Sequence, residues 1–210
     1  MVHAVLTGDI VNSTLLAPSQ EKKLLEELKN IFSPDKHEFY RGDSFQVYII
    51  DAGRALEMAL RCRTTAISLA QEETDTAFDV RVSIGLGSVE EPVNALSTAK
   101  GEAFLLSGRL LDEMGKTGGK LMITINEPPI GNMAFSILVD YINSIYRQMT
   151  AKQAEVIEEL LKGENQQQVA DKLNRSKSTI SQHVTAGRWE EIEEVIKKYK
   201  SLIELVSHDH

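Results

Sequence analysis

The stretch TAKQAEVIEELLKGENQQQVADKLNRSKSTISQHVTA, residues 150–186, has the most informative pattern in this chain. Thr150 and Gln153 form a capping box at the start of a helix. The apolar spacing predicts a second, short helix over Gln166–Leu173, and Ser176 is suited to cap a third. Two short helices joined by a turn of three or four residues predict a helix-turn-helix.

The outer face of the third helix has side chains that suit the edges of DNA bases. The helical spacing directs Ile180 and Val184 inward. Glutamine can bind adenine, lysine can bind guanine, and serine and threonine can hydrogen-bond to several bases. We therefore predict that the third helix contacts double-stranded DNA through Lys177, Ser178, Thr179, Ser181 and Gln182.

The distribution of charge supports this prediction better than the total does. The chain has a net charge of −8, which by itself argues against a nucleic-acid partner. Asn174–Arg188, however, contains three basic residues and no carboxylate, so it is a local site for an anion, unless the pattern is chance. Arg175, Arg188 and the helix amides near Gln166 suit DNA phosphates, which position a protein without reading sequence.

The three helices resemble the DNA-binding module of sigma-factor region 4 and of related response regulators. The resemblance is carried by residues 149–153, 168–173 and 176–180. It implies that residues 149–210 are a DNA-binding domain with a C-terminal helix. The alternative is a three-helix domain that binds another protein.

The last part of the chain repeats apolar residues at spacings of three and four. They are Trp189, Ile192, Ile196, Tyr199, Ile203 and Val206. Such a seam is typical of a dimerising helix pair. Val195, Leu202 and Leu205 widen the stripe, which favours a helix docked on its own chain.

The residues before the helix-turn-helix alternate between strand and helix patterns. Strands are predicted over residues 2–11, 39–40, 45–50, 80–86 and 121–125, and helices from Pro18 to Ser33, from Ala52 to Glu72 and over 101–114. In the strand over 80–86, alternation of apolar residues with Arg81, Ser83 and Gly85 predicts one wet face. The order predicts an α+β sandwich close to the ferredoxin-like type, with a mainly antiparallel sheet. Pro128-Pro129 ends this domain, so we predict an α+β domain over 1–127 and a linker with a connector helix over 128–148.

Two aspartates follow or connect predicted strands. Asp9 lies at the end of the first strand, and Asp43 lies in the turn of a hairpin. If the strands are neighbours, the two carboxylates could hold Mg²⁺ for a nucleotide triphosphate. The alternative is that both are ordinary turn residues.

These motifs resemble the sequence blocks of class III nucleotide cyclase domains. The resemblance implies that Asp9 and Asp43 match the two metal-binding aspartates and that Arg109 matches the transition-state arginine. The asparagine of that family falls on Leu105, and its two purine-selecting residues fall on Phe39 and Thr98. Leucine and phenylalanine side chains cannot hydrogen-bond to a ribose or a base, so we do not expect cyclisation of ATP or GTP.

The succession of a cyclase-like domain, a connector and a helix-turn-helix is similar to the SatD family. We therefore expect a dimeric DNA-binding regulator whose cyclase-like domain senses an effector, such as a nucleotide, or pairs two copies. The competing hypotheses are a metal-dependent cyclase or phosphohydrolase, and a protein-binding scaffold. A single cysteine, no signal-peptide pattern and no apolar stretch of membrane-spanning length predict a cytoplasmic protein.

Overall fold

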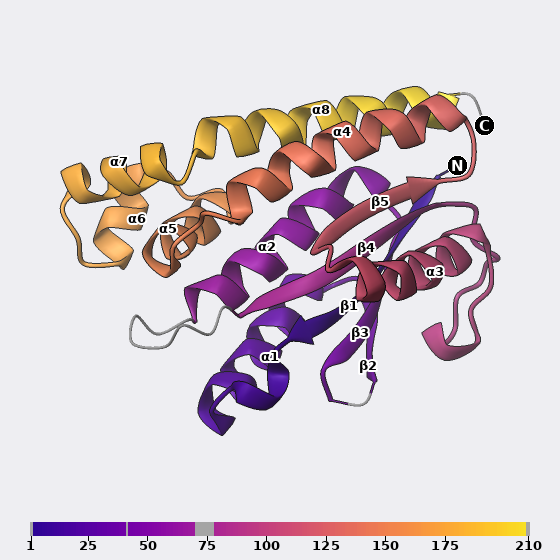
Figure 1. The fold of residues 1–210 in the computed structure, drawn as a ribbon, viewed down its shortest axis with the longest axis horizontal. Coiled ribbons are helices and arrows are strands. Elements are labelled where there is room, and N and C mark those ends of the chain that lie inside the picture. The colour runs from indigo at the N-terminus through magenta and orange to yellow at the C-terminus, as the bar shows by residue number, and fades with distance from the viewer. Residues whose placement is uncertain (1, 41, 70–77, 209–210) are drawn as a thin grey trace.

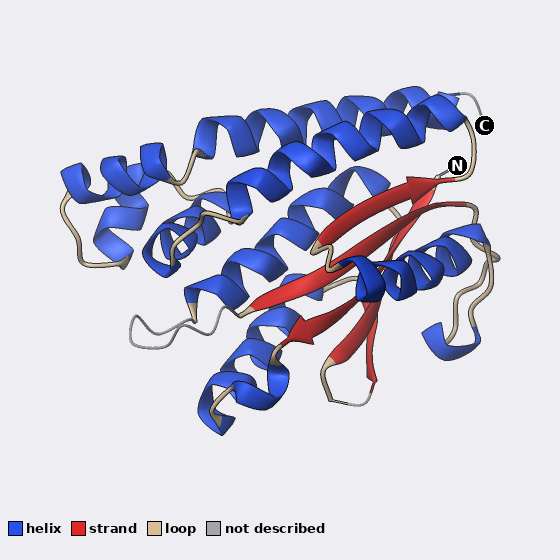
Figure 2. Cartoon of the chain, viewed as in Figure 1, coloured by secondary structure: helices blue, strands red, loops and turns tan. Residues whose placement is uncertain are grey.

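A computed structural model of the chain describes residues 2–40, 42–69 and 78–208. Strands and helices alternate up to Ile125, and helices alone follow (Figure 2). The strands are β1 (His3–Val11), β2 (Lys36–Tyr40), β3 (Ser44–Ile49), β4 (Asp79–Gly87) and β5 (Leu121–Ile125). The helices are α1 (Pro18–Phe32), α2 (Ala55–Ser68), α3 (Glu102–Thr117), α4 (Pro129–Tyr146), α5 (Ala151–Leu161), α6 (Gln166–Lys172), α7 (Lys177–Ala186) and α8 (Trp189–His208). Short 3₁₀ helices are η1 (Ser13–Leu15), η2 (Ala52–Arg54) and η3 (Leu96–Thr98).

The five strands form one sheet in the order β2-β3-β1-β4-β5. All neighbouring strands are antiparallel except β4 and β5, which are parallel. The order β1-α1-β2-β3-α2-β4 is that of the ferredoxin-like fold, and α3 with β5 extends it. The predicted fold class is confirmed: a mixed α/β domain with a mainly antiparallel sheet is followed by an all-helical region.

Helices cover both faces of the sheet. Helices α1 and α2 lie on one face, where Leu6 and Phe45 join the main core, and α3 lies on the other (Figure 1). On the α3 face, Val5 and Tyr48 pack against Ala103 of that helix.

The sequence prediction of a wet face on β4 is wrong for Ser83 and Gly85, because α3 covers them. The hydroxyl of Ser83 is buried, 2.8 Å from the carbonyl oxygen of Ser107 on α3. A Cβ atom at Gly85 would lie 2.3 Å from the carbonyl oxygen of Ala103. Small residues at these positions therefore let the helix backbone approach the strand closely.

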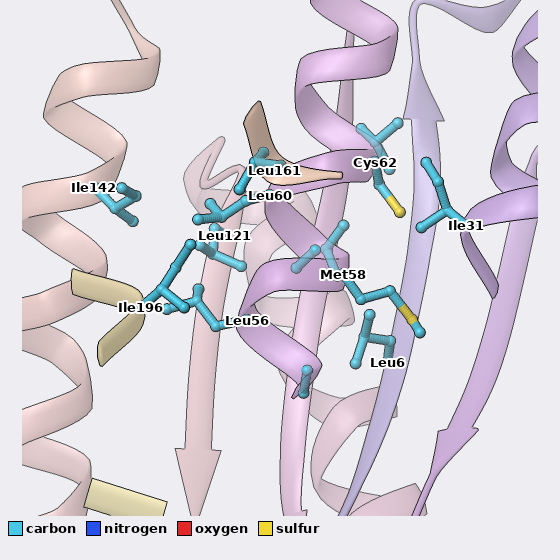
Figure 3. Close-up of a cluster of buried hydrophobic side chains, with 14 of the residues drawn as sticks. Leu6, Ile31, Leu56, Met58, Leu60, Cys62, Leu121, Ile142, Leu161 and Ile196 are labelled. Atoms are coloured by element: carbon cyan, nitrogen blue, oxygen red, sulfur yellow. The ribbon is translucent and has the colours of Figure 1, made fainter. Parts of the chain in front are cut away.

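Helix α2 is the central helix of the molecule. Eleven of its 14 residues are buried, and the other three, Glu57, Arg61 and Ser68, lie along one side, so the helix packs over most of its circumference rather than along one stripe. Figure 3 shows Leu60 beside Leu161 of α5, and Leu56 beside Ile196 of α8. The helix predicted from Ala52 begins with η2, and its predicted end at Glu72 lies outside the described residues.

Helix α8 docks on its own chain, beside α4 (Figure 1). The buried hydroxyl of Tyr199 donates a hydrogen bond to the carbonyl oxygen of Ala52 over 2.9 Å, and its ring packs against Phe135 of α4. Leu205, by contrast, does not widen the packed stripe, because 64% of it is exposed. The predicted segments 1–127, 128–148 and 149–210 all contribute side chains to one buried cluster.

Within the described part of the chain, no helix is both long and apolar enough to cross a membrane.

The close contact between α3 and β4 gives a stability prediction. Gly85→Ala is expected to lower the free energy of unfolding by about 1–3 kcal/mol, because the added methyl group meets backbone atoms that cannot move away easily. Gly108→Ala on α3 is the matched control, since its Cβ would meet no atom within 4 Å. That control should stabilise the protein by about 0.4–1 kcal/mol. Urea unfolding of both variants measures the difference, and equal stability of Gly85→Ala and the parent protein would contradict the packing argument.

Candidate nucleic-acid interface

The first helix of the helix-turn-helix begins and ends as its sequence predicts. The Oγ1 atom of Thr150 accepts a hydrogen bond from the amide of Gln153 over 3.3 Å, and the Gln153 side chain accepts one from the amide of Thr150 over 3.0 Å. Gly163 has a φ of +91°, a left-handed conformation that glycine adopts without strain. The predicted capping box and the glycine stop of α5 are thus confirmed.

The second helix has a cap that the sequence analysis missed. The Oδ1 atom of Asn165 accepts hydrogen bonds from the amides of Gln167 and Gln168 over 3.0 and 3.1 Å. The signal was present, because asparagine followed three residues later by glutamine is the same kind of capping box as at Thr150. Two of the amides near Gln166 that were expected to suit a phosphate therefore already have a partner inside the chain.

The third helix, α7, has the expected inner and outer faces. The Oγ atom of Ser176 caps it by accepting a hydrogen bond from the amide of Thr179 over 3.1 Å. Ile180 and Val184 are buried in the main core. The exposed residues on the outer side of the helix are Lys177, Ser178, Ser181, Gln182 and Thr185. Thr179 lies apart from them: it is half-buried, and its hydroxyl is 2.8 Å from that of Ser176.

Arg175, in the turn before α7, forms an ion pair with α5. The guanidinium of Arg175 donates a hydrogen bond to the carboxylate of Glu155 over 2.8 Å. Partial burial lowers the pKa of His183, and the positive charges of Arg175 and Lys152 lower it further.

Arg188 has partners that the sequence did not indicate. It has a φ of +57° at the junction of α7 and α8. Its Nη2 atom donates to the hydroxyl of Tyr141 on α4 over 3.0 Å, and its Nε atom donates to Glu191 over 3.1 Å. The guanidinium also lies 5.3 Å from the centre of the Tyr141 ring. A DNA phosphate would therefore have to share or replace these contacts.

The two strand-end aspartates are neighbours in the sheet, but each has a partner. Asp9 pairs in register with Ser44, the residue after Asp43. Its carboxylate forms an ion pair with Arg81 of β4 over 3.0 Å. The carboxylate of Asp43 accepts a hydrogen bond from the hydroxyl of Ser13 over 3.0 Å. The structure thus brings both residues to one end of the sheet, with their charges bound internally.

Of the other positions that match the cyclase family, Phe39 lies at this end of the sheet, on the strand pair beside Asp43, and the others lie on α3 and η3. Arg109 is exposed on α3, and its side chain forms no ion pair with the described residues. Leu105 on the same helix is 52% exposed. Phe39 packs against Phe32 and Phe45, with ring centres 5.9 and 6.1 Å apart. Thr98 is exposed in η3.

At the strand ends both carboxylates have internal partners, with which a metal-bound nucleotide triphosphate would have to compete. A divalent ion at Asp9 would first have to displace the guanidinium of Arg81. Among residues 2–40, 42–69 and 78–208, no group of three or more histidine, cysteine, aspartate or glutamate side chains could hold a metal ion. Mg²⁺ at a nucleotide is usually held by one or two carboxylates together with substrate phosphates and water, so the two aspartates could be its ligands only after they release Arg81 and Ser13.

Comparison with known sequences assigns the helix-turn-helix to a family. Residues 147–186 match the GerE family, described as "Bacterial regulatory proteins, luxR family". The match covers α5, α6 and α7. It indicates a LuxR-type DNA-binding domain, which is more specific than the resemblance to sigma factors and response regulators seen in the sequence. No curated protein matches the chain.

Comparison with solved structures finds nucleotide cyclases. The active GGEEF domain of a diguanylate cyclase from Vibrio cholerae aligns with a TM-score of 0.43 at 14% identity, covering 61% of this chain and 85% of that one. A bacterial light-regulated adenylyl cyclase aligns with a TM-score of 0.41 at 16% identity, covering 59% and 75%. The guanylyl cyclase domain of a RhoGC fusion protein from the aquatic fungus Blastocladiella emersonii aligns with a TM-score of 0.38 at 16% identity, covering 53% and 74%. At these scores the likeness says nothing about activity, and the fold class of the α/β domain follows from its own strand order and helix positions.

The strand-end geometry predicts an absence of cyclase activity. Purified protein incubated with ATP or GTP and Mg²⁺ or Mn²⁺ should form no more cyclic nucleotide than the Asp43→Asn variant. The reasons are that Leu105 and Phe39 cannot hydrogen-bond to ribose or base and that Arg81 neutralises Asp9. Mass spectrometry of the products is the measurement. Cyclic AMP or cyclic GMP that the parent protein makes and the variant does not would contradict this prediction.

Proposed function

We propose that this chain is a DNA-binding regulator of transcription that acts in the cytoplasm as a homodimer. Residues 150–186 bind double-stranded DNA, and the α/β domain senses an effector or pairs two copies without catalysing a reaction. The exposed polar face of α7, within a LuxR-type helix-turn-helix, is the observation that carries the proposal. This division of roles is also the one that the resemblance to the SatD family implies.

The side chains on α7 suit the recognition of bases. Gln182 is exposed one turn after Ser178, and Lys177 is exposed at the first position of the helix. A glutamine amide can donate to and accept from adenine, and a lysine can donate to guanine. Arg175 and Arg188 lie beside this face, and we assign them to phosphates, which position the domain.

An enzymatic role is the second candidate, because Asp9 on β1 pairs with Ser44, the residue after Asp43. In that case the chain would be a metal-dependent cyclase or phosphohydrolase that also uses Arg109. The ion pair between Asp9 and Arg81 and the apolar side chains at Leu105 and Phe39 make this candidate the weaker one.

DNA selection from a random pool tests the proposed function. The purified full chain should enrich a defined motif with two-fold symmetry, because paired helix-turn-helix modules bind half-sites about one helical turn apart. Gln182→Ala should relax the preference at one base pair, costing roughly 1–3 kcal/mol, whereas Arg188→Ala should weaken binding to all sequences alike and reduce the slope of affinity against salt by about one. Fluorescence anisotropy with the selected duplex measures both effects.

Lys22→Ala is the control for these variants. Lys22 lies on α1, and 79% of its side chain is exposed. It removes one positive charge outside the helix-turn-helix, so it should leave both sequence preference and salt slope unchanged. Lack of an enriched motif at low salt, or equal binding by all three variants, would overturn the proposal.

The proposed dimer has a candidate surface along α4. Large apolar side chains are exposed at Ile130, Met133, Ile137 and Tyr141, with Leu205 of α8 nearby. Their spacing of three and four residues places the α4 members along one side of that helix. The exposed side chains along this side of α4 are apolar apart from Asp140, so most of the surface between two copies would be apolar. It is continuous with the DNA-binding region, since Tyr141 accepts the hydrogen bond from Arg188. The predicted seam from Trp189 to Val206 is less suited, because most of its residues are buried within the chain.

Light scattering tests this surface. The parent protein is expected to have twice the mass of the chain at micromolar concentration, and Ile137→Glu is expected to shift it to the monomer, because a carboxylate cannot be buried without a partner. Ile50→Glu is the matched control, since Ile50 is 60% exposed after β3 and Ile137 is 64% exposed. A parent protein that is monomeric, or an Ile137→Glu variant that dimerises as the Ile50→Glu variant does, would contradict the assignment.

A further inference from the structure

A cleft of about 490 Å³ lies where the sheet domain meets the helix-turn-helix. We call it the junction cleft. Val11, Asp79 and the turn Gly118–Lys120 line it from the sheet side, and Arg147 and Ala151 line it from the side of α4 and α5. Its volume is within the range of small-molecule sites, about 300–1,000 Å³.

A buried arginine forms part of its wall. Arg63 of α2 is only 2% exposed. Its Nε and Nη2 atoms donate to the two carboxylate oxygens of Asp79 over 3.1 and 2.8 Å, and its Nη1 atom donates to Asn143 over 2.8 Å. A guanidinium has five N–H groups, so these bonds leave one N–H on each terminal nitrogen.

Two further cations, Lys120 and Arg147, line the cleft. Neither Lys120 nor Arg147 forms a side-chain hydrogen bond or ion pair with the residues that the structure describes. Asp79 is the one carboxylate among the described lining residues, and Arg63 already binds it. The cleft therefore has an excess of positive charge in a chain whose net charge is −8.

The rest of the lining supports a ligand that is both anionic and organic. Ala151 is the first residue of α5, so the positive end of that helix dipole borders the cleft. Ile67, Phe78 and Met149 add apolar surface. A site with a few converging charges on an otherwise apolar wall is the usual form of a small-molecule pocket.

We propose that the junction cleft binds a small phosphorylated organic molecule, with its phosphate held by Lys120, Arg147 and the free N–H groups of Arg63. Phosphate is the favoured anion because its two negative charges match the two unpaired cations, and its oxygens match the fork of a guanidinium. This site is separate from the strand-end aspartates that the cyclase resemblance indicates.

Occupancy of the cleft has a direct route to the helix-turn-helix. Met149 and Ala151 lie on either side of Thr150, the residue that caps the first helix of the DNA-binding domain. A ligand that contacts these residues and Gly118–Lys120 together would hold α5 against the end of the sheet. This second step rests on the proposed function, whereas binding of the ligand does not.

Isothermal titration calorimetry on the full chain tests the site. The probes are AMP, GMP, inorganic pyrophosphate and, as an anion without phosphate, citrate. At least one mononucleotide should bind with one site per chain, and Lys120→Gln and Arg147→Gln should each weaken it about tenfold or more, since a hydrogen bond to a charged group contributes that much. Lys116→Gln is the matched control, because Lys116 is exposed near the same end of α3 and outside the cleft.

Several results would overturn the proposal. The first is that neither mononucleotide nor pyrophosphate binds, and the second is that citrate binds as tightly as the phosphorylated probes. The third is that Lys120→Gln and Arg147→Gln leave binding unchanged, and the fourth is that only Asp43→Asn abolishes it. Calorimetry needs no DNA, so failure of the site and failure of the proposed DNA-binding function are distinguishable. Anisotropy with the selected duplex then tests whether the cleft is coupled to DNA binding. A mononucleotide that changes the DNA affinity of the parent protein but not that of Lys120→Gln supports the coupling. Equal DNA affinities with and without the mononucleotide overturn it.

Discussion

Helix α2 is buried over most of its circumference, and the need to cover it on both sides shapes the molecule. The sheet covers one side, and α5 and α8 cover the other. A helix of this kind is stable only when it is enclosed, so the helix-turn-helix cannot be an appendage on a flexible tether. Its first helix forms part of the same core as the sheet. Glu158 of α5 belongs to this contact: it accepts a hydrogen bond from Thr64 of α2 over 2.7 Å, and burial raises its pKa. A buried carboxyl group is costly unless its hydrogen-bond partners are kept. The contact between Glu158 and Thr64 therefore also fixes the position of α5 along α2.

Next to this contact along α2, the ion pair of Arg63 connects the layers. It joins α2 to Asp79 at the start of β4 and to Asn143 on α4, and the guanidinium lies 4.6 Å from the centre of the Tyr146 ring. Removing one member would leave a buried charge without a partner, which is far more destabilising than replacing the whole pair by apolar residues. The same arginine lines the junction cleft. Arg63 thus both holds the sheet, α2 and α4 together and lines the cleft in which a ligand would contact the helix-turn-helix.

The strand ends show how one fold serves different chemistry. Asp9 on β1 and Asp43 in the turn before β3 lie at one end of the sheet, where a metal site could use them. Asp9 nevertheless binds Arg81 across the sheet, and Phe39 packs in an aromatic cluster with Phe32 and Phe45. Function depends on the side chains at a site and not on the strand order that positions them. Here the side chains favour a structural role for the aspartates, and the exposed polar side chains are concentrated on α7 instead.

The sequence by itself determined the parts of this protein that depend on neighbouring residues. The capping residues Thr150 and Ser176, the glycine stop at Gly163 and the strand and helix periods all follow from hydrogen bonds and spacings within a few residues, and each could be predicted. The tertiary structure alone decided which distant residues meet. The burial of Ser83 and Gly85 under α3, the contact of Arg188 with Tyr141 and the partners of Arg63 join segments far apart in the chain. The outer faces of α7 were predictable because a helix buries one side and exposes the other. The internal partners of Arg175 and Arg188 were not, because an arginine binds whichever oxygen or ring the folded chain brings within its reach.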